Sequence, residues 1–193
     1  MNQENRQPLS AAEINAITIG GATPHNATIR LCEYDLAWPL LFEREAARVR
    51  LALGEAAIRV EHVGSTSVPH LAAKPIVDIL LEVADSGDEA SYVPALESHG
   101  YTLRIREPDW FAHRMLKGPD TDVNLHVFSA GCPEVERMLV FRDHLRTHPA
   151  DRELYCAKKR ELAARTWQYV QNYADAKTAV VEEIIARATG KSC

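Results

Sequence analysis

Asp78 is a carboxylate inside a strongly β-forming segment, residues 75–83, with the sequence PIVDILLEV. About a dozen residues earlier, Gly64 and Ser65 interrupt another apolar run and predict a tight turn. Gly64 lets the backbone approach a ligand closely, and free N–H groups from Ser65 and Thr66 onward form a site for phosphate. A carboxylate on a neighbouring strand is a hard oxygen ligand for Mg²⁺. The combination predicts a metal and phosphate site.

Alternation divides residues 75–83 into two different faces. One face carries only apolar side chains, and the other carries Ile76, Asp78, Leu80 and Glu82. Both carboxylates of this strand, Asp78 and Glu82, therefore share a face and are candidate catalytic residues and metal ligands.

A later strand, residues 122–128, places Asp122, Asn124 and His126 on one face. Three polar groups in a row on a central strand need partners, because buried polar groups without partners are costly. His126 is a candidate catalytic residue, and Asp122 is the remaining acidic candidate for a metal. The alternative is a solvated sheet face.

Several cations are candidates for contact with phosphate. Lys74 precedes the Asp78 strand, and Arg142 and Arg146 are four residues apart, so they share one face of a predicted helix. Lys158 and Lys177 on later helices extend this set into a wall that faces an anion. The alternative is that these basic residues lie on solvated faces.

Five segments together resemble the GrpB family of small bacterial proteins: EHVGSTSVP, AAKPIVDILLEV, REPDWFAHRML, NLHVF and FRDHLRTHP. They occur in the family's order, and the similarity extends over residues 30–188. The Gly-Ser turn followed by Asp78 is similar to the nucleotidyltransferase signature. The resemblance implies an α/β (α+β) fold, a nucleotidyltransferase-like mixed β-sheet with flanking helices and a helical C-terminal part.

The resemblance also implies an activity, a Mg²⁺-dependent transfer of a nucleoside monophosphate from an NTP to a small acceptor. In the superfamily pattern a second acidic residue stands where this chain has Leu80. Metal would then be held by Asp78 with Glu82, or with Asp122 and His126. The alternative function is a module that binds a nucleotide or phosphorylated metabolite without turnover, and Leu80 favours it.

The composition of the chain limits the classes of partner that we expect it to bind. A formal charge of −5 over 193 residues argues against broad binding of long nucleic acids, which usually needs a basic face. The polar N-terminal sequence and the lack of a long apolar run predict a cytoplasmic protein that does not enter a membrane. The four cysteines are scattered without metal-ligand spacing and are expected to be reduced thiols.

The elements that position these residues follow from local patterns. We expect an arm at residues 1–27 with a short helix near 11–17, and one domain at residues 28–190. Within the domain we predict an edge strand at 28–33, a helix from Asp35 to Gly54, strands at 58–63 and 75–83, and a helix from 88 to His99. Strands at 101–106, 110–117 and 122–128 follow, and from about residue 133 the chain is predicted as helices at 133–147, 151–168 and 172–188.

Overall fold

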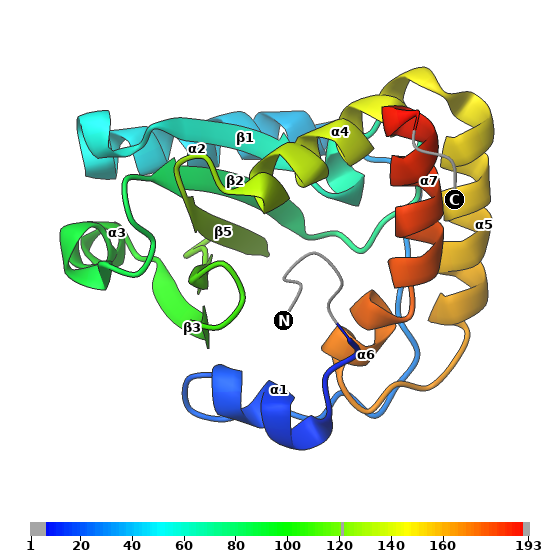
Figure 1. Ribbon diagram of the computed structural model, residues 1–193, viewed down its shortest axis with the longest axis horizontal. Coiled ribbons are helices and arrows are strands. Elements are labelled where there is room, and N and C mark those ends of the chain that lie inside the picture. Colours follow the sequence, from blue (N-terminus) through cyan, green and yellow to red (C-terminus); the bar gives the residue numbers. More distant parts are fainter. Residues whose placement is uncertain (1–6, 121, 191–193) are drawn as a thin grey trace.

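The computed structural model describes residues 7–120 and 122–190, and a five-stranded mixed sheet lies at its centre (Figure 1). The spatial order of the strands is β1-β2-β5-β4-β3. Their bounds are β1 Arg59–Val63, β2 Val77–Val83, β3 Thr102–Glu107, β4 His113–Lys117 and β5 Val123–Ser129. The predicted fold class, a mixed sheet with flanking helices and a helical C-terminal part, is confirmed.

Strand β2 is the reference point for the site. It pairs antiparallel with β1 and parallel with β5, while β5, β4 and β3 form an antiparallel run. The register between β2 and β5 places Asp78 beside Asn124 and Leu80 beside His126. Because paired residues project to the same face of a sheet, Asp78, Asn124 and His126 share a face as predicted.

The opposite face of β2 is the main core. Val77, Ile79, Leu81 and Val83 pack there with helix α2 (Ala37–Leu53), which contributes Trp38 and Val49, and with helix α3 (Val93–Ser98). The predicted helix after Asp35 is confirmed, and it ends at Gly54 as expected. The predicted helix from 88 to His99 is shorter, because a 3₁₀ turn at Glu89–Ser91 precedes α3.

Helix α4 (Pro133–Thr147) covers part of the Asp78 face. Leu80 and Phe128 are buried there with Val135 of this helix. Pro133 stands in the first turn of α4, where the missing N–H group has no intrahelical partner to lose. The space between Asp78 and Glu82 is therefore filled by the buried side chain of Leu80 and is not open to a ligand.

The C-terminal helices differ from the prediction in two places: the helix predicted at 151–168 ends at Ala163, and the last helix is divided. Helix α5 (Pro149–Ala163) is continuous, but the single helix expected at 172–188 is two helices, α6 (Val170–Asp175) and α7 (Thr178–Thr189). Tyr173 is buried against Ile29 and Leu162, whereas Val180 and Ile184 are buried in a different cluster. A turn between the helices lets both sets be buried, and it places Lys177 at the start of α7.

The N-terminal segment packs against the sheet edge and the helices. Helix α1 (Ala11–Ile17) is confirmed; Ser10 caps it, and Ile19 N–H donates to the Arg104 carbonyl of β3. The edge strand predicted at 28–33 is wrong. Ile29 N–H instead donates to the carbonyl of Ala163 at the end of α5, so this segment forms isolated bridges rather than a sheet strand.

The structure bears on the predictions about membrane entry and about the cysteines. Within the described ranges, no helix is both long enough and apolar enough to cross a membrane. Cys32, Cys132 and Cys156 are free thiols, and Cys193 lies outside the described residues.

Candidate functional site

The turn after β1 packs directly against Asp78. Gly64 has φ +67° and ψ −171°, a conformation available almost only to glycine, and the 3₁₀ turn Ser65–Ser67 follows it. A Cβ on Gly64 would lie 3.0 Å from Cβ and 3.1 Å from Cγ of Asp78, and nearer still to Oδ2. Ser67 Oγ closes the turn by donating to the Gly64 carbonyl at 2.6 Å. Glycine is therefore required for the close approach of the turn to the carboxylate.

Asp78 is the central acid of the site. Asn124 Nδ2 donates to its Oδ1 at 2.8 Å, and His126 Nε2 lies 3.6 Å from the same oxygen. Burial alone would raise the pKa of Asp78, but His126, Lys74 and Asn124 outweigh it, so the pKa lies below its usual value. With 28% of its side chain exposed, Asp78 is an ionised carboxylate that a ligand can reach.

A line of polar side chains continues from Asp78 into the sheet. The Nδ1 atom of His126 lies 3.1 Å from Nε2 of His113. On the other side of the His113 ring, Nδ1 lies 2.7 Å from Oε2 of Glu107. His113 and Glu107 are both buried. The line therefore runs from a buried carboxylate, past two imidazoles, to the partly exposed carboxylate of the site.

Three lysines surround Asp78 on its other side. Burial and the neighbouring Lys177 lower the pKa of Lys74 to about 8, and burial is the main cause that lowers the pKa of Lys159 to about 7. Burial also lowers the pKa of Lys177, although the charge of Asp78 opposes the shift. One carboxylate does not offset three crowded ammonium groups, so the cluster favours a further anion.

Two tyrosines hold these lysines in place. Nζ of Lys177 lies 4.7 Å from the centre of the Tyr173 ring, and Nζ of Lys74 lies 5.9 Å from it. Tyr155 is hydrogen-bonded to Ser65 and lies beneath Lys159, whose Nζ is 5.2 Å from the ring centre. Cation–π contacts of this kind stabilise ammonium groups that burial has removed from water.

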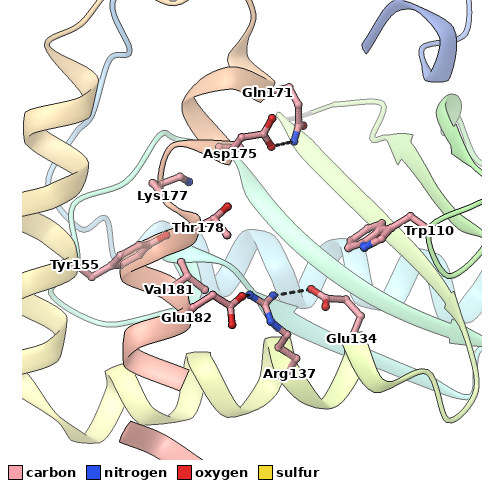
Figure 2. Close-up of a pocket in the computed structure, with 11 residues that line it drawn as sticks. Trp110, Glu134, Arg137, Tyr155, Gln171, Asp175, Lys177, Thr178, Val181 and Glu182 are labelled. Carbon is pink, nitrogen blue, oxygen red and sulfur yellow. Dashed lines mark hydrogen bonds and ion pairs between the residues drawn. The ribbon is translucent and has the colours of Figure 1, made fainter. Parts of the chain in front are cut away.

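A cavity of about 260 Å³ adjoins this cluster. Figure 2 shows Lys177 and Tyr155 on one side of it and Trp110 on the other, with Arg137 between Glu134 and Glu182. Lys177 and Tyr155 both interact electrostatically with Asp78, so the cavity and the Asp78 site share a wall. Its volume is at the low end for ligand pockets, which suits a small molecule.

The sequence matches a known family over most of its length. A sequence model described as GrpB protein matches residues 28–187. The chain belongs to the GrpB family. This confirms the resemblance seen in the five sequence segments, and the Asp78 site lies within the matched region.

Relatives extend this GrpB assignment. A UPF0157 protein of Halalkalibacterium halodurans is 59% identical over 187 residues, which cover 97% of this chain and 96% of that protein. The crystal structure of conserved protein GrpB from Enterococcus faecalis matches with a TM-score of 0.73 and 33% identity, covering 84% of this chain and 98% of that one. A dephospho-CoA kinase of Mycolicibacterium paratuberculosis is 30% identical over 167 residues, which cover 72% of this chain but 40% of the kinase.

The GrpB chain does not bring all predicted metal ligands together. Glu82 is buried and paired with Arg59 at 2.7 Å, on the far side of Leu80 from Asp78. Asp122 is exposed and pairs with Lys117 at 2.6 Å. Across residues 7–120 and 122–190, no group of three or more His, Cys, Asp or Glu side chains could hold a metal ion. Asp78 and His126 are the predicted ligands that do lie together.

The predicted phosphate-binding residues divide into two groups in this GrpB structure. Gly64, Ser65 and Lys74 are at the site. Arg142 and Arg146 instead support the turn: Arg142 donates to the carbonyl of His62 at 3.0 Å, and Arg146 donates to that of Ser67 at 3.0 Å.

Thr66 is buried, and its hydroxyl lies 3.1 Å from Nε2 of His62. Burial lowers the pKa of His62 to about 4, so this imidazole is neutral at physiological pH. The Thr66 hydroxyl is therefore part of the support of the turn, and only its backbone N–H remains a candidate for phosphate.

Removing Arg142 should weaken the fold. We expect Arg142→Met to lower the free energy of unfolding by about 1.5–3 kcal/mol, the typical contribution of hydrogen bonds to a charged group. Arg165→Met is the matched control, because Arg165 is exposed and, among the residues that the structure describes, pairs with the exposed Glu161; it should cost at most about 0.5 kcal/mol. Urea denaturation measures both. Equal losses in the two variants would contradict the role of Arg142.

Sequence patterns missed three members of the GrpB site. Lys159, His113 and Glu107 gave no signal beyond their charge, because the packing of α5 brings in Lys159 and the pairing of β3 with β4 places Glu107 opposite His113. Lys158, which we placed in the anion-facing wall, pairs with Glu161 on the exposed side of α5, whereas its neighbour Lys159 is buried toward the site. Neighbouring residues on a helix point in different directions, so the orientation of the helix decides which of two neighbouring lysines is buried.

Proposed function

We propose that this GrpB protein binds the triphosphate of an NTP at the Gly64 turn and transfers the nucleoside monophosphate to a small acceptor in the adjoining cavity. The observation that carries the proposal is the convergence of an ionised Asp78, a glycine turn and three lysines with lowered pKa values. A polyanion would restore charge to these lysines, which supports triphosphate as the ligand.

The residues present fit one divalent cation. Mg²⁺ commonly keeps several waters and uses one or two carboxylates together with substrate phosphates, so Asp78 is sufficient as its carboxylate ligand. Such an ion would neutralise charge on the phosphates. A second ion is less well supported, because Leu80 and the Arg59-paired Glu82 leave no further carboxylate on β2 beside Asp78.

The chain's own residues have distinct tasks in the proposed reaction. Lys74 and Lys177 bind the phosphates, and the cavity beside Lys177 orients the acceptor. The acceptor oxygen or nitrogen forms a bond to the α-phosphorus, the bond from that phosphorus to the bridging oxygen breaks, and pyrophosphate leaves with the electron pair. The acceptor's proton passes to water. Positioning and charge stabilisation provide most of the catalysis in reactions of this kind.

The kinase relatives add independent support for phosphorus chemistry. A segment similar to this chain occurs within proteins named as dephospho-CoA kinases. Dephospho-CoA and CoA therefore belong in the first acceptor screen, beside simple alcohols and amines.

One observation favours a second function, nucleotide binding without turnover. At the position between Asp78 and Glu82 on β2, where the superfamily pattern has a second acidic residue, this chain has the fully buried Leu80. This alternative predicts nucleotide binding with little dependence on Mg²⁺ and no release of pyrophosphate with any acceptor.

The two functions are tested by calorimetric titration with ATP, GTP, CTP and UTP, each with Mg²⁺ and with EDTA. We expect Lys177→Met to weaken binding about ten- to hundredfold, as loss of a charged hydrogen bond to phosphate would. Lys158→Met is the matched control, because it removes an exposed lysine from the same region and should change affinity less than about twofold. If no nucleotide binds, or if both variants behave alike, the triphosphate site is wrong.

The lysine pKa values also predict a pH dependence. The free protein loses the Lys74 proton as pH rises through about 8, so triphosphate binding above that pH must take up a proton. Affinity should then fall by up to about tenfold per pH unit, which titration in two buffers of different ionisation enthalpy will detect as proton uptake. Affinity that is constant from about pH 7 to about pH 9 would contradict this assignment.

Stability should change in the opposite direction. The unfolded chain holds the Lys74 proton up to about its ordinary pKa of 10.5, so between about pH 8 and that value it binds more protons than the folded chain. The contribution of Lys74 therefore makes the fold more stable as pH rises through this window. A loss of affinity caused by unfolding would show the reverse trend in urea denaturation.

A further inference from the structure

Helix α2 is apolar on two opposite faces. One face packs against the sheet, where Trp38 and Val49 are buried in the main core. The other face points to solvent and carries Leu36, Leu40 and Leu51, whose exposed fractions are 81%, 73% and 78%. A surface helix usually has polar residues opposite its core face, so the second apolar face needs an explanation outside the core.

The exposed apolar residues of α2 form one stripe. Leu36 precedes the helix with helical backbone angles, and Ala47 is also exposed. Successive residues of an α-helix are rotated by about 100°, which places Leu36, Leu40, Ala47 and Leu51 within about 60° of one another and along about 22 Å of the axis. Exposed apolar residues that gather in this way mark an interaction surface, whereas scattered ones do not.

The charges beside the stripe indicate that its partner is a second copy of the same helix. Glu43 and Arg50 lie on one flank of the stripe, and both are exposed, although Nη2 of Arg50 lies 3.4 Å from the Val60 carbonyl oxygen. In two antiparallel helices related by a twofold axis, each flank faces the same flank of the other helix. Glu43 of each copy then faces Arg50 of the other, so the charges are complementary.

The same arrangement pairs the apolar residues. It places Leu40 opposite Leu51 of the second copy, and Ala47 opposite Ala47. The midpoints of these pairs and of the pair formed by Glu43 and Arg50 agree within about 2 Å along the helix axis, so one twofold axis satisfies all of them. The small side chain of Ala47 lets the helices approach closely where they cross.

The other flank of the stripe does not oppose this contact. It carries Arg44 and Arg48, which lie 3.3 and 3.1 Å from the carboxylate of Glu45 in the same helix. Asp120 also pairs with Arg48. Carboxylates of the same chain therefore offset the positive charge of this flank. A helix that binds anionic lipid usually has an excess of basic residues, whereas this stripe is bordered by both signs of charge.

We propose that the exposed face of α2 binds a second copy of this chain, in an antiparallel helix pair with Leu40, Ala47 and Leu51 at its centre. Helix α2 packs on the face of the sheet that carries Val77, whereas Asp78 and helix α4 lie on the opposite side (Figure 1). The dimer therefore leaves both Asp78 sites open. This inference goes beyond the proposed function, and neither depends on the other.

The test is sedimentation equilibrium of the full chain from about 1 to about 200 μM, because a contact made by one helix of each copy is small and should have a Kd on the order of 10 μM. Leu40→Gln should raise this Kd at least about 100-fold, because both buried copies of the leucine are lost. Leu154→Gln is the matched control: Leu154 is 39% exposed on α5, outside the stripe, and its loss should change the Kd less than about threefold.

Charge exchange tests how the two helices are oriented. Glu43→Arg should raise the Kd about tenfold or more, because it places like charges together on both sides of the twofold axis. Adding Arg50→Glu exchanges both charges and should restore the Kd to within about threefold of its original value. Far-UV circular dichroism should be the same for all variants, because each changed side chain is exposed in the single chain.

A chain that stays monomeric over this concentration range would overturn the proposal. A dimer with an unchanged Kd in Leu40→Gln would assign the contact to another surface, and failure of Arg50→Glu to restore Glu43→Arg would contradict the antiparallel pair. A monomer that binds phosphatidylglycerol vesicles through Leu40 would show that the stripe contacts lipid instead. Leu40→Gln should bind nucleotide as the original chain does, so the dimer and the proposed function are tested separately.

Discussion

Replacing Asp78 by asparagine is expected to abolish Mg²⁺-dependent nucleotide binding and to slow nucleotidyl transfer by about 10³-fold. A metal ion contributes several kcal/mol of charge stabilisation, and about 1.4 kcal/mol corresponds to a factor of ten in rate. Asparagine keeps the size of the side chain and an oxygen that can accept from Asn124, so the fold should persist. Calorimetry with Mg²⁺ and with EDTA, and an assay of pyrophosphate release, measure the two effects.

Asp122→Asn is the matched control for Asp78→Asn. Asp122 was also a candidate metal ligand, but its carboxylate is 54% exposed and bonded to Lys117 at the edge of the site. We expect this variant to keep its Mg²⁺ dependence and to change nucleotide affinity less than about threefold. If Mg²⁺ still strengthens binding in Asp78→Asn, or if Asp122→Asn loses that effect, Asp78 is not the main carboxylate ligand.

Gly64→Ala is expected to eliminate nucleotide binding and to destabilise the protein. The backbone conformation at Gly64 costs another residue about 1–3 kcal/mol, and the new methyl group would overlap the carboxylate of Asp78, adding about 1–3 kcal/mol. To relieve the overlap, the turn must move away from Asp78, which separates the phosphate site from the acid. Urea denaturation and nucleotide titration at low denaturant measure stability and binding separately.

Gly54→Ala separates strain from displacement. Gly54 also has a positive φ, +55°, but a Cβ there would meet no atom within 4 Å. It should therefore cost about 1–3 kcal/mol in unfolding free energy and leave nucleotide affinity unchanged. A Gly64→Ala protein that binds nucleotide as tightly as Gly54→Ala would show that the close contact of turn and carboxylate is not needed.

The sheet and most helices could be predicted because their signals are local. The alternation around Asp78 identified both faces of β2, and Gly54 and Pro133 marked the end of α2 and the start of α4. These signals depend on residues a few positions apart, whose relation is determined by the geometry of strands and helices. The edge strand expected at 28–33 failed for the same reason: alternation indicates an extended backbone but does not say what the backbone pairs with.

The amino-acid sequence by itself determined the family, the order of the elements, and the position of Asp78 beside a glycine turn on a central strand. Only the tertiary structure decided which charges reach that carboxylate. In the folded chain, the groups near Asp78 and His126 include Lys159 from α5, Lys177 from the turn between α6 and α7, and His113 from β4. Glu82 instead forms an ion pair with Arg59. Such contacts join residues far apart in the chain, and they form only where burial of separate apolar faces orients the helices against the sheet.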